Sequence, residues 1–178
     1  MDKKEKCIKS NLIYDGKILS LYKDEIITPN NITTYREIVR HKGGVCCLSI
    51  KDGYIYFVKQ YRYAYSKEIL ELPAGKLADN ENPIDAMKRE LKEEIGFISK
   101  SLEYMGYMYP SVGYTDEIIH LFYSSENEVT STARDIDEFM DIIKIKIEDS
   151  YKMLDNNEFE DAKTIILLSK LRKVLLKD

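Results

Sequence analysis

The stretch 71–97 constrains the fold more than any other part of this 178-residue chain. Asn82 followed by Pro83 is typical of a helix start, because asparagine caps the first turn and proline fits its first position. Gly96 is a typical helix terminator. Between these signals, four apolar residues recur at helical spacing: Ile84, Met87, Leu91 and Ile95. The sequence therefore predicts one bounded amphipathic helix over 83–95.

Strand-like segments precede and follow this helix. Alternating patterns and turn residues predict strands over 18–28, 32–41, 45–50, 54–61, 68–72, 101–109, 117–123 and 139–147. The end of the chain predicts helices over 147–154 and 161–176. In the second of these, several residues fall near one face: Ala162, Ile165, Ile166, Ser169 and Val174.

This order of elements predicts an α/β fold in which helices pack on both faces of a mixed sheet. An antiparallel β region precedes that sheet. We expect residues 1–41 to form this N-terminal β region and residues 42–178 to form the main domain. A chain of this length is sufficient for one domain of ordinary size.

Composition excludes several classes of protein. The chain has 27 basic and 31 acidic residues and a net charge of −4, which disfavours a general nucleic-acid binder. No segment has the length and apolarity of a membrane span, and the N-terminus shows no secretory signal. The three cysteines form no C-x-x-C pair, so we expect a cytoplasmic protein that binds neither nucleic acid nor membrane. Cys46 and Cys47, adjacent on a predicted strand, should be buried on opposite faces.

Three carboxylates gather on the predicted central helix. Glu90, Glu93 and Glu94 fall within an arc of roughly 100° beside the apolar stripe. Like charges at the edge of a buried face are unfavourable, and a bound cation would relieve their repulsion. Hard oxygen ligands favour Mg²⁺ or Mn²⁺. Taken alone, the pattern also fits an ordinary charged amphipathic helix.

A longer motif gives these carboxylates a context. The pattern G-x5-E-x7-R-E-U-x-E-E-x-G-U, in which U is a bulky apolar residue, is matched at every specified position from Gly75 to Phe97. This pattern is the Nudix box. The chain therefore resembles Nudix hydrolases, which cleave a nucleoside diphosphate linked to another moiety. The resemblance implies a Nudix-type α/β/α sandwich.

The resemblance also implies roles for individual residues. Glu90 and Glu94 match the principal metal ligands, Glu93 matches a third helix carboxylate, and the carbonyl of Ala74 matches a further ligand. Arg89 matches a residue that orients the glutamates. Gly75 matches the glycine of the box. In the family this position forms a tight loop beside the diphosphate, which a residue without a Cβ permits. Glu81 matches a structural position in the loop.

Segments outside the box resemble the ADP-ribose pyrophosphatase branch of the family: 60–62, 71–75, 111–117 and 161–164. Val112 stands where that branch usually has proline, so nucleoside diphosphate sugars in general stay within the prediction. The guanidinium of Arg62 is the expected partner of the diphosphate. Lys59, on the strand predicted over 54–61, is a second candidate and is expected to lie on the same strand face as Arg62.

The predicted activity is Mg²⁺- or Mn²⁺-dependent hydrolysis of ADP-ribose or a related nucleoside diphosphate sugar. Alternatives are a Nudix-fold ligand sensor, an isoprenoid diphosphate isomerase, or a hydrolase of another nucleoside diphosphate derivative. In the branch, the general base often comes from an acidic loop after the box. Here we expect Glu138, then Asp137, with Glu93 as the rival. The branch also implies a homodimer with an exchanged N-terminal sheet.

Overall fold

The structure is a computed structural model that describes residues 2–132 and 139–176. The chain forms two compact units. One comprises the residues up to Gly43 together with Tyr109–Ile118, and the other comprises Gly44–Met108 together with the residues from Ile119 onward. The prediction of a boundary near residue 41 did not anticipate that 109–118 would pack with the N-terminal strands.

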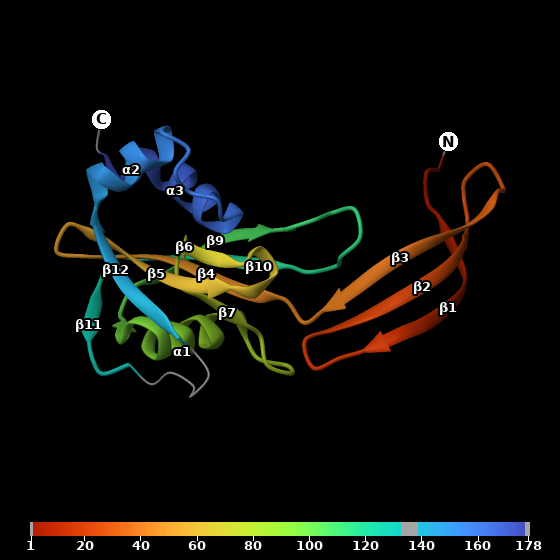
Figure 1. Cartoon of the computed structure of the whole chain (residues 1–178), viewed down its shortest axis with the longest axis horizontal. Helices are drawn as coiled ribbons and strands as arrows, with labels where there is room; N and C mark the ends of the chain where they lie inside the picture. Colours follow the sequence, from red (N-terminus) through yellow and green to blue (C-terminus); the bar gives the residue numbers. More distant parts are fainter. Residues whose placement is uncertain (1, 133–138, 177–178) are drawn as a thin grey trace. The chain divides into compact units, whose positions relative to one another are not determined.

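A seven-stranded mixed sheet forms the centre of the second unit (Figure 1). Its main path runs β12-β5-β4-β10-β9, with β6 beside β5 and β7 beside β4. Only β10 and β4 pair in parallel among these strands of the described chain. The strands are β4 (Gly44–Lys51), β5 (Tyr54–Arg62), β6 (Lys67–Glu71), β7 (Ala74–Lys76), β9 (Leu102–Met108), β10 (Ile119–Ser124) and β12 (Met140–Lys146). A separate ribbon pairs β8 (Phe97–Ser99) with β11 (Asn127–Val129).

Helices cover both faces of this sheet. Helix α1 (Pro83–Ile95) lies on one face, and α2 (Ile147–Asp155) and α3 (Ala162–Leu175) lie on the other (Figure 1). A single turn of 3-10 helix, η1 (Tyr63–Tyr65), connects β5 to β6. The predicted α/β/α sandwich with a mixed sheet is therefore confirmed.

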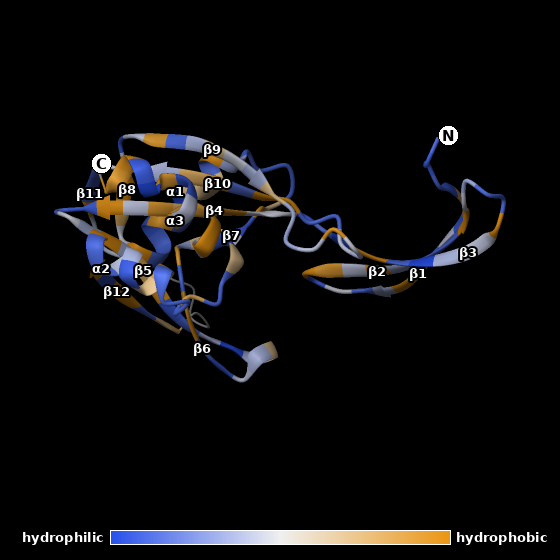
Figure 2. Ribbon diagram, turned by 90° about the horizontal axis from the view of Figure 1, so that it is seen from above, coloured by the Kyte–Doolittle hydropathy of each residue, from blue (hydrophilic) through white to orange (hydrophobic). Residues whose placement is uncertain are grey.

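The strand β4 shows how the sheet separates two apolar cores. Figure 2 colours most of this strand as hydrophobic. Cys46 packs in a core with residues of α3, whereas Cys47 packs in a second core with residues of α1. Both cysteines are fully buried. The predicted alternation of their side chains across the sheet is confirmed.

Helix α1 begins and ends where the sequence predicts. The Asn82 side chain accepts a hydrogen bond from the Ile84 backbone N–H at 2.9 Å, and Gly96 ends the helix at φ 66°. Met87 and Leu91 are fully buried. Ile84, which shares the predicted apolar stripe, is instead 44% exposed.

The predicted apolar face of the last helix is wrong in part: Ile165 and Ile166 pack against the core, but Ala162, Ser169 and Val174 are exposed. Helix α3 buries Thr164, Leu167, Leu168 and Leu171, which follow the spacing i, i+3, i+4, i+7. Val174, assigned to the predicted face, is 56% exposed. The prediction gave weight to the isoleucines and overlooked the leucine stripe that lies next to them.

The N-terminal unit contains one antiparallel sheet of three strands. These are β1 (Lys6–Asp15), β2 (Leu19–Ile27) and β3 (Thr33–His41), of which the first was not predicted. The segment Tyr109–Ile118 runs alongside β3, where the Val39 N–H donates a hydrogen bond to the Tyr114 carbonyl at 2.7 Å. Large apolar side chains are exposed on this sheet and in its turns: Ile8, Leu12, Ile13, Tyr14, Ile18, Leu19, Ile32 and Tyr35. Among the helices described, none is both long and apolar enough to span a membrane.

Candidate active site

The short strand β7 and helix α1 meet at Gly75. Gly75 pairs with Val45 of β4, and the chain then loops back to the start of α1. A Cβ atom added at Gly75 would lie 1.9 Å from the carboxylate carbon of Glu90. The Glu90 carboxylate therefore packs directly against the Gly75 backbone, and only glycine leaves it that space.

A second carboxylate lies one helical turn further along α1. Glu94 accepts a hydrogen bond from the Ala74 backbone N–H at 2.9 Å. Glu90 is 7% exposed and Glu94 is 5% exposed. Burying carboxylates is costly unless cations or hydrogen-bond donors compensate their charge. The two predicted ligands thus lie buried beside the predicted ligand Ala74 and the predicted loop residue Gly75.

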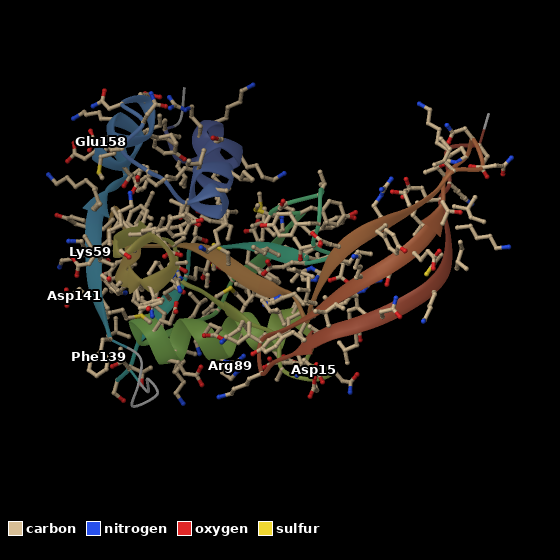
Figure 3. All side chains as sticks on the ribbon, turned by 45° about the vertical axis from the view of Figure 1, so that its right-hand side comes forward. Asp15, Lys59, Arg89, Phe139, Asp141 and Glu158 are labelled. Carbon is tan, nitrogen blue, oxygen red and sulfur yellow. The ribbon has the colours of Figure 1, made fainter. Side chains whose placement is uncertain are left out.

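Arg89 connects the acidic residues on the exposed side of this junction. Its guanidinium pairs with Glu81 at 3.0 Å, Glu90 at 2.8 Å and Glu93 at 2.9 Å, and donates to the Lys76 carbonyl at 3.2 Å. Hydrogen bonds from Arg89, followed by one from the Ala78 N–H, lower the pKa of Glu81. Arg89 is labelled beside α1 in Figure 3, and its side chain is 36% exposed. The arginine is therefore placed to orient the glutamates, as the box predicts.

The carboxylate oxygens of the box glutamates and the Ala74 carbonyl oxygen are chemically suited to a hard divalent cation. Carboxylates and a backbone carbonyl are the ligands that Mg²⁺ and Mn²⁺ prefer. Within 2–132 and 139–176, however, no three His, Cys, Asp or Glu side chains are gathered closely enough to hold a metal ion. Glu93 forms an ion pair with Arg89, and the Glu93 side chain is 32% exposed. The buried pair Glu90 and Glu94 is accordingly the better-supported part of the predicted ligand set.

Arg62 and Lys59 do not share a strand face. They are three residues apart on β5, an odd number, so regular strand geometry directs them to opposite sides. Lys59 pairs with Glu68 at 2.8 Å, whereas Arg62 makes a two-point contact with Glu71 at 2.5 and 2.8 Å. The expectation of a shared face is wrong. Lys59 is also labelled in Figure 3.

Glu71 holds Arg62, and Lys163 in turn holds Glu71; sequence reasoning left both of these residues without a role. Glu71 is only 3% exposed and also accepts a hydrogen bond from Lys163 Nζ at 2.6 Å. Burial opposes ionisation of Glu71, but hydrogen bonds from Arg62 and the charge of Lys163 outweigh it and lower its pKa. Burial likewise acts against the charge of Lys163, yet Asp161 and other acidic neighbours raise its pKa to about 12. Glu71 and Lys163 lie 92 residues apart in sequence, so no local pattern could have paired them.

The predicted general base is not among the residues that the structure describes. Glu138 and the next choice, Asp137, fall outside the described residues. The adjoining Phe139 is 81% exposed just before β12 begins (Figure 3). The rival base Glu93 lies on α1, in contact with Arg89.

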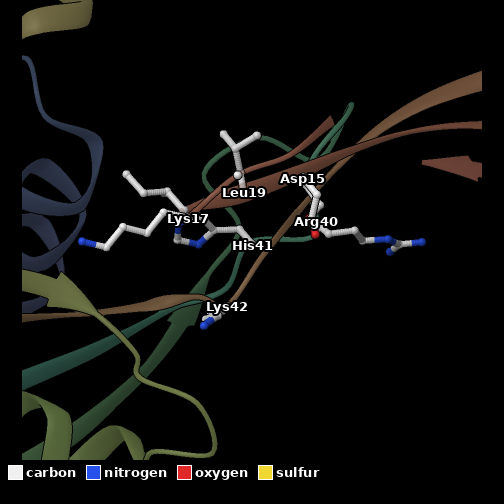
Figure 4. Close-up of a pocket in the computed structure, with 9 residues that line it drawn as sticks. Asp15, Lys17, Leu19, Arg40, His41 and Lys42 are labelled. Carbon is white, nitrogen blue, oxygen red and sulfur yellow. The ribbon is translucent and has the colours of Figure 1, made fainter. Parts of the chain in front are cut away.

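A separate hollow of about 430 Å³ occurs within the N-terminal unit. Lys17, Arg40 and Lys42 line it, which raises the question of an anion site. Figure 4 shows Lys17 and Arg40 extending in opposite directions. Arg40 is also paired with Asp116 at 3.0 Å. Lys17 and Arg40 therefore do not converge on one anion in this hollow.

Comparison with known proteins identifies the class to which this fold and site belong. The NUDIX domain model matches residues 40–168, so the chain belongs to the Nudix family. The ADP-ribose pyrophosphatase of Bacillus subtilis (strain 168) is 38% identical over 171 residues, covering 94% of this chain and 92% of that protein. The methanol dehydrogenase activator of Bacillus methanolicus is 36% identical with the same coverage. A crystal structure of an ADP compounds hydrolase has a TM-score of 0.86 at 17% identity, covering 98% of this chain and 96% of the other, which supports the fold.

Gly75→Ala should damage the site without damaging the fold. The three atoms nearest to the added methyl group all belong to the flexible end of Glu90, so we expect the carboxylate to move while the backbone stays. We expect kcat/KM to fall roughly 10–100-fold. The melting temperature should fall by no more than about 2–4 °C, the shift expected for about 1 kcal/mol in a chain of this size. Steady-state kinetics and thermal unfolding measure the two effects.

A double-mutant cycle provides the control. If Gly75→Ala acts only through the Glu90 carboxylate, it should add no further loss in a Glu90→Ala background. Independent, additive losses in the double variant would contradict the contact between Gly75 and Glu90 as the cause.

Proposed function

We propose that this Nudix protein is a metal-dependent hydrolase of ADP-ribose or a related nucleoside diphosphate sugar, with a nucleoside monophosphate and a sugar phosphate as products. The observation that carries the proposal is the pair of buried carboxylates, Glu90 and Glu94, held against β7. A 38% identical relative named ADP-ribose pyrophosphatase supports the substrate class.

Nudix hydrolases generally use divalent metal ions, and we propose Mg²⁺, with Mn²⁺ as a substitute. Glu90, Glu94, Glu93 and the Ala74 carbonyl would hold it. When bound, such a cation polarises phosphoryl oxygens, activates water and neutralises the leaving phosphate. The chain's own residues orient these groups, since Arg89 contacts both Glu90 and Glu93.

The substrate's diphosphate would lie near Gly75 and Arg62. The Arg62 side chain is 39% exposed although Glu71 anchors one edge of its guanidinium. Its remaining donors are therefore available to phosphate oxygens. Lys59 stays a prediction as a second phosphate contact, and it would have to leave its ion pair with Glu68.

A turnover panel tests the proposed activity. Purified protein is assayed on ADP-ribose, ADP-glucose, GDP-mannose, FAD, NADH and 8-oxo-dGTP with Mg²⁺, with Mn²⁺ and with EDTA. We expect metal-dependent release of AMP from ADP-ribose, or of a nucleoside monophosphate from another nucleotide sugar. Dominant turnover of 8-oxo-dGTP would contradict the substrate class, and ligand binding without turnover would indicate a sensor.

The proposed general base is Glu138, with Asp137 next. Box glutamates that bind a cation are poor bases, because the cation lowers their pKa. Glu138→Gln should therefore lower kcat by roughly 10²–10⁴ and leave KM little changed. The matched variant Glu93→Gln tests the rival. A kcat loss of less than about threefold in Glu138→Gln would exclude Glu138 as the base.

We also propose a homodimer built through the N-terminal β region. The large apolar side chains exposed on β1, β2 and β3 support it, because a monomer rarely leaves such a surface uncovered. Light scattering should give twice the 20.8 kDa mass of the chain. A mass of 20.8 kDa at working concentration contradicts the dimer. A cytoplasmic location is proposed as well, since all three cysteines are free thiols.

A further inference from the structure

A buried group of four charges ties the start of α3 to the end of β6. Glu71 lies at its centre and accepts hydrogen bonds from Arg62 and Lys163. Lys163 also donates to Asp161 at 2.8 Å. The Lys163 and Asp161 side chains are only 13% and 15% exposed. Two cations and two carboxylates thus form a neutral cluster, which we call the Glu71 cluster.

Backbone contacts fix this cluster beside the active-site loop. The Asp161 carboxylate caps α3 by accepting the Thr164 N–H at 3.0 Å. The Thr164 hydroxyl oxygen in turn accepts the Leu72 N–H at 2.9 Å. Leu72 is two residues before Ala74, so the first turn of α3 sets the path of the chain into the proposed metal-binding loop.

Arg62 is the member of the Glu71 cluster that reaches solvent. Its side chain is 39% exposed, whereas that of Glu71 is 4% exposed. The pKa of Arg62 is raised by its hydrogen bond with Glu71, against the effect of burial, and Glu94 adds to the increase. Arg62 is therefore the group through which the Glu71 cluster would contact the diphosphate.

We propose that Lys163 is a positioning residue for substrate binding: it shares the Glu71 carboxylate with Arg62, keeps the Glu71 cluster neutral and so leaves Arg62 able to bind a diphosphate. This inference rests on the proposed function. Lys163 acts through Glu71, because its ammonium is bound to Glu71 and Asp161 inside the protein. Without Lys163, the cluster would carry a net negative charge next to an anionic substrate, which opposes binding.

The test separates charge balance from simple structural support. Lys163→Met should raise KM for ADP-ribose roughly tenfold, the factor that corresponds to 1.4 kcal/mol, while kcat changes less than about threefold. Adding Asp161→Asn to Lys163→Met restores a neutral cluster, and asparagine remains a good helix cap. The double variant should therefore recover a KM within about threefold of wild type.

Two further variants complete the design. Lys163→Gln removes the charge but retains a hydrogen-bond donor, and it should raise KM as Lys163→Met does. The matched control is Lys67→Met, which removes an exposed ion pair with Glu160 between β6 and the segment before α3. Exposed pairs contribute little, so this variant should keep wild-type kinetics. Melting temperatures are recorded for every variant.

The outcomes distinguish this inference from the proposed function. An unchanged KM in a folded Lys163→Met or Lys163→Gln variant, with wild-type protein active, would contradict the role of Lys163 alone. A double variant with a KM no better than that of Lys163→Met would also contradict it, since structural support predicts no recovery. Absence of wild-type turnover on all nucleotide sugars would contradict both.

Discussion

The burial of Glu90 and Glu94 between α1 and β7 is the constraint on which the rest of the site depends. Two carboxylates one helical turn apart repel each other, and burial removes the water that would screen them. The structure compensates this with a guanidinium on Glu90 and a backbone N–H on Glu94. The absence of a side chain at Gly75 gives Glu90 its space. A divalent cation bound at this position would place positive charge beside both carboxylates.

The sandwich fold explains how the site is held rigid. Helix α1 buries Met87 and Leu91 against one face of the sheet. This packing fixes the direction of the glutamates, which lie on the adjacent face of the helix. Helix α3 packs on the opposite face through its leucine stripe and brings Lys163 to Glu71. Strand β7, which contains Ala74 and Gly75, is therefore bounded by interactions from both layers of helices.

Sequence reasoning was most successful where the signals were local. The cap at Asn82, the terminator Gly96 and the helical spacing of the box glutamates are properties of one short segment, and the structure shows the helix that they predict. The prediction of the buried face of α3 was wrong in part, because two apolar stripes lie on that helix and only packing against the sheet selects one of them. The link between Glu71 and Lys163 could not be predicted, since it joins two segments that only the tertiary fold brings together.

Mn²⁺ binding, followed by the electron paramagnetic resonance signal of the free ion, tests the central claim most directly. We expect wild-type protein to bind Mn²⁺ and Glu94→Gln to weaken the affinity roughly tenfold or more, a loss of at least about 1.4 kcal/mol. Asp85→Asn, an exposed carboxylate change in the first turn of the same helix, should bind as wild type does. Equal Mn²⁺ affinity in Glu94→Gln and wild-type protein would contradict the assignment of the buried carboxylates as the metal site.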